Sequence, residues 1–388
     1  MRHFYARRVF KTRAFTLVEI LTVIAIIGIL MGLLLPAVGR TLAAARASQC
    51  SARLGQMGIA IVGYASDRDS LPGYLQKFGE FQGGVDPADP GNFGGAVPRH
   101  FKIGGWPIAA MSKLDNQPLY EVWSMDRYPL IADDGGERAP SFDGYSAAAS
   151  PVYEAFICPS GSGHLSSRGL NHFVANTGMH APSGFSYQRP GQSTVAVDFL
   201  RSMSSANGLF NNRYAGFNPS NPSQLMPVGK RVRLDDITDG ASSTLMLSEN
   251  HQAMPLHTTA LTGNANHLMN IQTVSGKEVI ASPPVARYLQ GALWHFEDPT
   301  GFASAPPVNP VHKINGGDVY ELQMNSSNFA DVARPSSLHI GGAHVAMADA
   351  SVRFLVDKID YRVYQSMMTP HGKSSDVPMN EFLATEAF

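Results

Sequence analysis

Cysteine is scarce in this sequence, which contains only Cys50 and Cys158. Two thiols are too few for a structural zinc site built from four thiolates, and they exclude the dense disulfide framework of many small secreted domains. A single bridge between Cys50 and Cys158 would need an oxidising compartment, and two buried free thiols are the alternative. The residues alone leave both states open.

Charge is also low, because Asp, Glu, Lys and Arg together make up 16% of the 388 residues. The 30 basic residues nearly balance the 31 acidic ones, which leaves a formal net charge of -1. A nucleic-acid-binding surface built on net positive charge is therefore not expected, and we predict no nucleic acid partner.

Common catalytic signatures are missing as well. Ser160 and Ser205 lack the G-x-S-x-G pattern of a nucleophile elbow, and the sequence has no H-E-x-x-H, phosphate-binding loop or dinucleotide-binding glycine pattern. We therefore predict that the protein is not an enzyme.

Glycine and proline are abundant, with 37 and 26 residues, and they favour turns over a helical bundle. Residues 73–99 are predicted as a surface loop, whereas the apolar spacing within residues 106–123 predicts helix. Short apolar runs bounded by turn-forming residues predict β-strands. These runs cover residues 156–158, 193–197, 244–247 and 344–347. Together they predict a loop-rich, mainly antiparallel β-sheet.

The N-terminus carries the strongest pattern. Residues 1–14 hold five basic and no acidic residues, and residues 15–35 are apolar with Glu19 as the only charge. A membrane-spanning helix needs about 20 apolar residues, and flanking basic residues stay on the cytoplasmic side. We predict a single-pass anchor in the cytoplasmic membrane, with a cytoplasmic N-terminus and a periplasmic or cell-surface head.

An ordinary signal peptide, cut near residues 43–47, and an uncleaved anchor are the alternatives. The apolar region of a signal peptide is about 7 to 15 residues long and has no carboxylate, so the length of this run and Glu19 argue against it. A carboxylate inside a membrane helix costs about 2.5 to 3.5 kcal/mol. Glu19 therefore needs a partner.

The string AFTLVE at residues 14–19 resembles the cleavage and methylation site of type IV prepilins. The resemblance implies that a prepilin peptidase cuts between Ala14 and Phe15 and methylates the new amine of Phe15. It also implies that Glu19 pairs with the positively charged N-terminus of a neighbouring subunit, and that Pro36 takes the place of a helix-kinking proline. Ala14 departs from the glycine that usually precedes the cut.

Beyond Pro36, apolar residues between Leu54 and Tyr64 recur at helical spacing, which predicts an amphipathic stem packed on the head. We expect an α+β, pilin-like fold in which this long N-terminal helix packs on the sheet. Four regions follow. They are a basic leader at residues 1–14, a transmembrane and assembly helix at 15–36, a stem helix at 37–70 and an extracytoplasmic globular domain at 71–388.

Further landmarks resemble a family of large pseudopilin-like bacterial proteins with a C-terminal H-x9-D-G box. Here the box runs from His339 to Asp349, and Ala350 replaces its glycine. If that glycine serves a turn with positive φ, either Ala350 strains the turn or the turn differs here. The other landmarks are Gln49-Cys50, Trp106 with Leu119-Tyr120, Cys158-Pro159-Ser160, Asn176-Thr177-Gly178, residues 207–210, residues 237–240 and Ser248-Glu249.

Imidazoles and carboxylates near the C-terminus are candidate metal ligands. His339, His344 and Asp349 are spaced by five residues, which puts neighbours on opposite faces of a strand, so a structural role near a hairpin is the alternative. Residues 235–240 resemble an acidic calcium loop only faintly, and a capped turn is the alternative. Glu249 is an isolated candidate acid, base or ligand, or marks a strand end. A divalent metal such as calcium is the one cofactor left open.

Two functions agree with these patterns. The first is a pseudopilin-like structural subunit of a type II secretion or type IV pilus-like system, processed by prepilin peptidase and assembled with itself or other pseudopilins through its apolar helix. The second is a membrane-tethered extracytoplasmic module whose turn-rich head binds a carbohydrate or another solute.

Overall fold

The computed structural model contains two compact units, which divide within one helix between Arg46 and Ala47. The described residues are 16–133, 143–161, 169–180, 185–188, 194–197, 199–257, 259, 265–298, 305–316, 324–325 and 327–378. The predicted leader, with Ala14 and Phe15, lies outside these residues.

Helix α1 spans Leu17–Arg68 and runs without interruption through Pro36. Good helix formers such as Leu, Ala and Met dominate its sequence, together with Ile. The helix ends where Asp69 adopts a left-handed backbone with φ of 53°, a conformation that commonly follows the last helical turn. Its N-terminal part is long and apolar enough to cross a membrane, and the large apolar side chains there are exposed.

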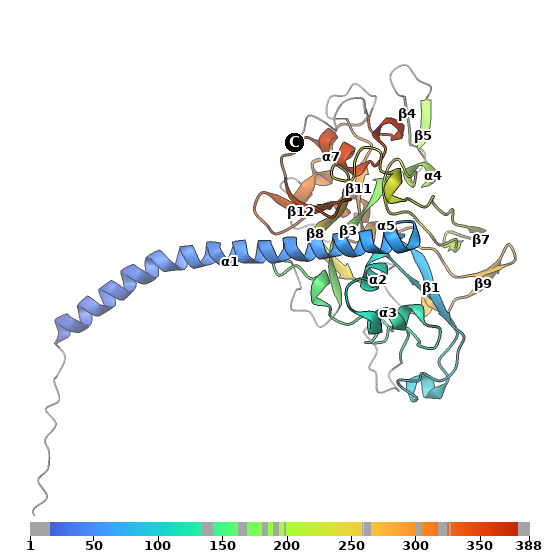
Figure 1. Cartoon of the computed structure of the whole chain (residues 1–388), viewed down its shortest axis with the longest axis horizontal. Coiled ribbons are helices and arrows are strands. Elements are labelled where there is room, and N and C mark those ends of the chain that lie inside the picture. The colour runs from blue at the N-terminus through green and yellow to red at the C-terminus, as the bar shows by residue number, and fades with distance from the viewer. Residues whose placement is uncertain are drawn as a thin grey trace, which may run out of the picture. The chain divides into compact units, whose positions relative to one another are not determined.

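The second unit, which we call the head, holds the strands and the shorter α-helices of the described residues (Figure 1). The strands are β1 (Gln76–Phe81), β2 (His100–Gly104), β3 (Leu170–His180), β4 (Phe185–Gln188), β5 (Thr194–Val197), β6 (Phe217–Asn218), β7 (Asn221–Leu225), β8 (Leu245–Pro255), β9 (Gln272–Val274), β10 (Lys277–Val279), β11 (Gly291–His295), β12 (Gly342–Met347) and β13 (Val352–Val356). The helices are α2 (Trp106–Met111), α3 (Gln117–Ser124), α4 (Phe199–Ser202), α5 (Ala286–Leu289), α6 (Phe329–Val332) and α7 (Tyr361–Met368).

Five strands form the central sheet in the order β11-β3-β8-β12-β13. The β11–β3 pair is parallel, and the other three pairs are antiparallel. The strand pairs β1–β2, β4–β5, β6–β7 and β9–β10 form separate two-stranded sheets. The prediction of an α+β fold with a mainly antiparallel sheet is therefore confirmed.

The strands predicted at residues 193–197, 244–247 and 344–347 correspond to β5, β8 and β12. Strand β8 begins one residue later than predicted, at Leu245, and residue 193 lies outside the described residues. The strand predicted at residues 156–158 is wrong, because a 3-10 helix over Glu154–Phe156 precedes an irregular segment there. The side chains of this run are nevertheless buried. The short apolar run thus correctly indicated buried side chains, but side chains on an irregular backbone can be buried as well as those on a strand.

The surface loop predicted at residues 73–99 is wrong in part, because β1 lies within it and pairs with β2. This pairing buries Phe81 and Phe101. The helical spacing within residues 106–123 is confirmed, since α2 and α3 cover most of it. The side chain of Asn116 caps α3 by accepting a hydrogen bond from the backbone of Leu119, which satisfies a helix donor that would otherwise lack a partner.

A hydrophobic core covers each face of the central sheet. Neighbouring residues of β3 point to opposite faces, so that Phe173 joins one core and Val174 the other. Helix α1 contributes Leu54, Met57 and Ile61 to the first core, and α7 contributes to the second. Burying each of these three stem side chains stabilises the head by about 1.5 to 3 kcal/mol.

Two glycines let the stem part of α1 approach the sheet closely. A Cβ atom at Gly58 would lie 3.2 Å from Ala350, and a Cβ atom at Gly55 would lie 3.3 Å from Val352. Ala350 and Val352 belong to the hairpin of β12 and β13. The stem therefore packs directly on the end of the predicted H-x9-D box.

The turn of this hairpin requires a left-handed residue, and Ala350 supplies it with φ of 66°. Asp349 accepts hydrogen bonds from the backbone and the hydroxyl of Ser351 at 2.9 and 2.6 Å. Ala350 thus occupies a conformation that favours glycine, as the departure from the box suggested.

We expect Ala350→Gly to raise the free energy of unfolding by about 1 kcal/mol. A left-handed backbone costs an L-residue about 1 to 2 kcal/mol, and the greater freedom of glycine in the unfolded chain offsets part of the gain. The thermal midpoint of the full chain in detergent measures the effect. Ala348→Gly is the control, because Ala348 has no positive φ and its replacement should destabilise. An unchanged or lower midpoint for Ala350→Gly would contradict the prediction.

Candidate functional site

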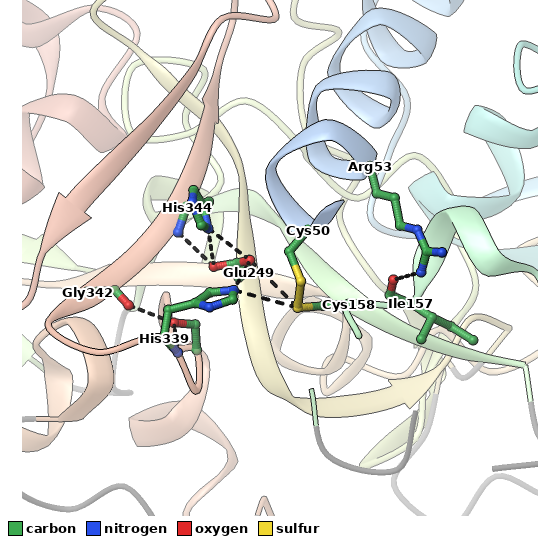
Figure 2. The surroundings of a disulfide bond; sticks show 9 residues. Cys50, Arg53, Ile157, Cys158, Glu249, His339, Gly342 and His344 are labelled. Atoms are coloured by element: carbon green, nitrogen blue, oxygen red, sulfur yellow. Dashed lines mark hydrogen bonds and ion pairs between the residues drawn. A yellow bond between two sulfur atoms is a disulfide. The ribbon is translucent and has the colours of Figure 1, made fainter. Parts of the chain in front are cut away.

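A disulfide joins the stem to the rest of the head. It connects Cys50 on α1 with Cys158, and Figure 2 shows its surroundings. Both residues are buried, so solvent has little access to the bridge. Of the two states that the sequence left open, the structure has the bridge.

Arg53, one helical turn after Cys50, makes a second connection. Its Nη1 donates to the carbonyl oxygen of Ile157 at 2.6 Å, and its Nη2 lies 3.3 Å from the carboxylate of Glu154. The Glu154 side chain is exposed, so that ion pair adds little stability. The bond to Ile157 fixes the backbone that leads into Cys158.

A buried carboxylate lies beside the bridge. The side chain of Glu249, on β8, is 2% exposed. Its Oε1 lies 3.8 Å from Cys158 Sγ and 3.1 Å from His339 Nε2. Its Oε2 accepts the backbone N–H of His344 at 2.7 Å, and the ring Nδ1 of His344 lies 3.2 Å from both oxygens. Two histidines and a sulfur thus meet at one carboxylate (Figure 2).

Two local features position these histidines. His344 lies on β12, which pairs with β8 beside Glu249. His339 precedes β12 in a loop that Ser337 holds in place. The Ser337 hydroxyl donates to the carbonyl oxygen of Gly342 at 2.6 Å and accepts the backbone N–H of His339 at 3.0 Å. The strand and this loop therefore bring the two rings to the same side chain.

Glu249 is ionised in this cluster. Burial opposes its ionisation, but the hydrogen bonds from His339 and His344 outweigh burial and hold its pKa below the ordinary value of 4.5. Because an ionised carboxylate only accepts hydrogen bonds, the imidazole nitrogens that face it carry protons. The cluster is a buried, charged hydrogen-bond network beside a disulfide.

A second group of histidines lines a cavity of about 230 Å³. His295 on β11 stacks on His312 with 3.4 Å between ring centroids, and the ring of His180 on β3 is 4.8 Å from that of His295. The carboxylates of Glu297 and Asp331 also line the cavity. Its size suits a small solute rather than a polymer.

The three histidines of this cavity differ in their surroundings. His312 bridges two carboxylates, with Nδ1 at 2.7 Å from Glu297 and Nε2 at 3.1 Å from Asp331. Burial lowers the pKa of His180 to about 4 and the pKa of His295 well below its ordinary value. Two neutral imidazoles thus lie beside a histidine that bridges two carboxylates.

At the start of α1, Glu19 caps its own helix. Its Oε2 accepts hydrogen bonds from the backbone and the hydroxyl of Thr16 at 2.8 and 2.9 Å, while the Thr16 hydroxyl oxygen accepts the Glu19 N–H at 3.3 Å. This reciprocal arrangement is a capping box. The carboxylate is exposed.

Comparison with known protein families finds matches to two segments of the chain. Residues 42–362 match a family described as a protein of unknown function, DUF1559, and residues 10–35 match the prokaryotic N-terminal methylation motif. The chain belongs to the DUF1559 family. No curated protein and no solved structure matches it.

The two matches make this DUF1559 chain a prepilin-like protein, which confirms the first resemblance drawn from residues 14–19. With the apolar N-terminal part of α1, the motif indicates that the chain is anchored in a membrane. The H-x9-D-G box is not part of what these matches describe, and it stays an interpretation of the sequence.

The structure brings together part of the predicted metal set. His339 and His344 meet at Glu249, whereas Asp349 is exposed and bonds Ser351 in the hairpin turn. The hydrogen bonds of Asp349 agree with the structural role that was the alternative, and the metal set stays a prediction. Glu249 takes the place that the sequence analysis had given to Asp349.

The acidic segment at residues 235–240 forms a capped turn. Asp236 accepts the backbone N–H of Arg233 at 2.8 Å, and Asp239 accepts that of Gly372. These hydrogen bonds form the capped turn that was the alternative to a calcium loop for this segment. Both carboxylates thus accept hydrogen bonds from backbone N–H groups of described residues.

Sequence reasoning missed the histidine-lined cavity and the central role of Glu249. Ninety residues separate Glu249 from His339, and no short-range spacing connects residues so far apart. The sequence signals were Glu249, taken as an isolated candidate acid, base or ligand, and His339 with His344 in the candidate metal set, and nothing connected Glu249 to the two histidines. Pairing between β8 and β12 is what joins them.

Proposed function

We propose that this DUF1559 protein is a pseudopilin-like structural subunit of a type II secretion or type IV pilus-like system. The observation that carries the proposal is the match of residues 10–35 to the N-terminal methylation motif. The exposed apolar side chains at the start of α1 support it, because a membrane or neighbouring helices would cover them.

In this proposal, prepilin peptidase removes residues 1–14 and methylates Phe15. The basic residues of the leader keep the N-terminus in the cytoplasm, so the head lies in the periplasm or at the cell surface. Residues 15–36 act as the anchor and assembly helix, and residues 37–70 as the stem. The buried disulfide supports an extracytoplasmic head, since such bonds persist in oxidising compartments.

Glu19 would then have one role in the single chain and another in the assembled filament. In a single chain Glu19 caps its own helix, and in a filament it would neutralise the methylated amine of Phe15 in the next subunit. Neutralisation removes the cost of a carboxylate in the membrane. Pro36, which α1 accommodates without interruption, lies at the end of this segment.

Mass spectrometry of the N-terminal peptide from the native envelope tests the proposal. We expect a peptide that begins at Phe15 and carries one extra methyl group. A start near Ala45, or an intact Met1, would reject prepilin processing and leave a secreted or simply anchored protein.

We expect Glu19→Ala to reduce filament or pseudopilus assembly by about 100-fold. The amine of the neighbouring subunit would be left unpaired in the membrane, at a cost on the order of 2.5 to 3.5 kcal/mol. Sedimentation of sheared surface material measures assembly, and Thr22→Ala is the matched control because the Thr22 hydroxyl bonds only a carbonyl within α1. Normal incorporation of Glu19→Ala would contradict the role given to Glu19.

A second candidate function is binding of a small polar solute by the head, which the histidine-lined cavity favours. A ligand that binds only the folded head raises its thermal midpoint. The full chain in detergent would be screened against carbohydrates, amino acids and small carboxylates. A shift with one class that disappears in Glu297→Gln supports this function, and no shift with any of them counts against it.

A further inference from the structure

The Cys50–Cys158 bridge lies among side chains that bind metals. One sulfur, nitrogen or oxygen atom from each of four residues lies within 4.8 Å of the others. These residues are Cys50, Cys158, Glu249 and His339. We propose that reduction of the bridge converts this cluster into a tetrahedral site for one zinc ion. The inference holds whether or not the protein assembles into filaments.

The distances between the ligand atoms fit zinc. Zinc bonds of about 2.3 Å to sulfur and about 2.0 to 2.1 Å to nitrogen and oxygen place sulfur about 3.5 Å from the other atoms and nitrogen about 3.3 Å from oxygen. In the head, Cys158 Sγ lies 3.8 Å from Glu249 Oε1 and from His339 Nε2. The latter two atoms are 3.1 Å apart. Three ligands thus already approximate one face of the tetrahedron.

The surroundings orient the ligands as an outer shell would. The backbone N–H of His344 holds Oε2 of Glu249 at 2.7 Å, which turns Oε1 toward the sulfurs. Ser337 fixes the backbone of His339 at 3.0 Å. On metal binding, the neutral ring of His339 takes the tautomer that carries its proton on Nδ1, and Nε2 exchanges its hydrogen bond with Glu249 for a bond to zinc. Such supporting contacts keep metal ligands in place.

Ligand type and burial favour zinc over other ions. Two thiolates with one imidazole select zinc over calcium or magnesium, which prefer oxygen. All four residues are buried or nearly so, as in a closed structural site. The charge of two thiolates and one carboxylate exceeds that of Zn²⁺ by one, and the backbone N–H of His344 stabilises the carboxylate of Glu249 by a hydrogen bond.

The redox step balances with a dithiol as reductant. The dithiol passes two electrons and two protons to the Cys50–Cys158 bond and becomes a disulfide itself, while both cysteines become thiols. Zinc then displaces one proton from each thiol. A newly made chain, whose cysteines have not yet been oxidised, needs no reductant. In either state the stem stays linked to the head, by sulfur or by metal.

Cobalt is the probe for the experiment, because its absorption reports thiolate ligands and tetrahedral geometry. The full chain in detergent is reduced with a dithiol, freed of reductant without oxygen, and titrated with Co²⁺ and then Zn²⁺. We expect one Co²⁺ per chain with thiolate-to-metal absorption, displacement by Zn²⁺, and protection of both thiols from alkylation until a chelator is added. The oxidised chain should show none of these.

Variants distinguish this site from other histidines. His339→Gln should weaken zinc binding more than about 100-fold, whereas His344→Ala, which removes an outer contact, should weaken it about 10- to 100-fold. His371→Ala, outside the cluster, should bind as the natural chain does. Absence of thiolate absorption in the reduced natural chain would overturn the proposal, as would equal affinity in a folded His339→Gln variant. The alkylation assay also tests the proposal without any variant, because thiols of the reduced natural chain that react despite bound metal would overturn it.

Discussion

Cys158→Ser is expected to lower the free energy of unfolding of the head by about 4 kcal/mol. The bridge joins residues separated by 108 positions, and closing a loop of that size removes chain entropy from the unfolded state worth about 2 to 5 kcal/mol. The unfolded natural chain is constrained by the bond, and the variant is not. Stability should therefore fall although few folded-state contacts change.

Denaturant unfolding of the full chain in detergent measures this loss. Fluorescence is a suitable signal, because Trp106, Trp123 and Trp294 are fully buried. Ser160→Ala is a control close to Cys158 that leaves the bridge intact. A loss below about 1 kcal/mol, or equal loss in the control, would show that the bridge does not constrain the chain in the way that we infer.

Glu249→Ala is expected to destabilise the head by about 3 to 5 kcal/mol. Removing one member of a buried charged cluster leaves the others without a partner at this cost. The backbone N–H of His344 and the ring of His339 both lose their acceptor. Glu154→Ala is the matched control, because the Glu154 side chain is 87% exposed, and it should change stability by less than about 1 kcal/mol.

The same carboxylate predicts a pH dependence. The pKa of Glu249 is lower in the folded head than its ordinary value of 4.5, so the unfolded chain takes up this proton first as pH falls. Its contribution to stability is full above the unfolded pKa and is lost as pH falls through the lower, folded pKa. The stability difference between the natural chain and Glu249→Gln should therefore shrink as pH falls below about 4.5. A difference that does not change between about pH 6 and pH 3 would contradict this.

Local patterns predicted the parts of this protein that depend on neighbours in the chain. The charge step before residue 15, the apolar run to residue 35 and the helical spacing from Leu54 to Tyr64 each lie within one segment. They predicted an anchor helix and a stem, and α1 includes both in one helix. Ala350 was likewise identified from one departure in a short motif, and its positive φ bears this out.

Less local features were predicted only in part. The apolar run at residues 156–158 is buried without forming a strand, since periodicity reports burial over so few residues and not the backbone that provides it. The parallel pairing of β11 with β3 joins segments more than a hundred residues apart. No turn or spacing in the sequence signals such a contact, so only the folded sheet shows the pairing and its register.

The sequence by itself therefore determined the prepilin-like N-terminus, the long helix and the α+β class of the head, because helix propensity, hydropathy and capping act over a few residues. Only the tertiary structure decided that Cys50 meets Cys158, that Glu249 rather than Asp349 receives His339 and His344, and that three histidines line one cavity. The physical reason is that each of these groups depends on strand pairing and core packing between distant segments. Those contacts are selected by the folding of the whole head.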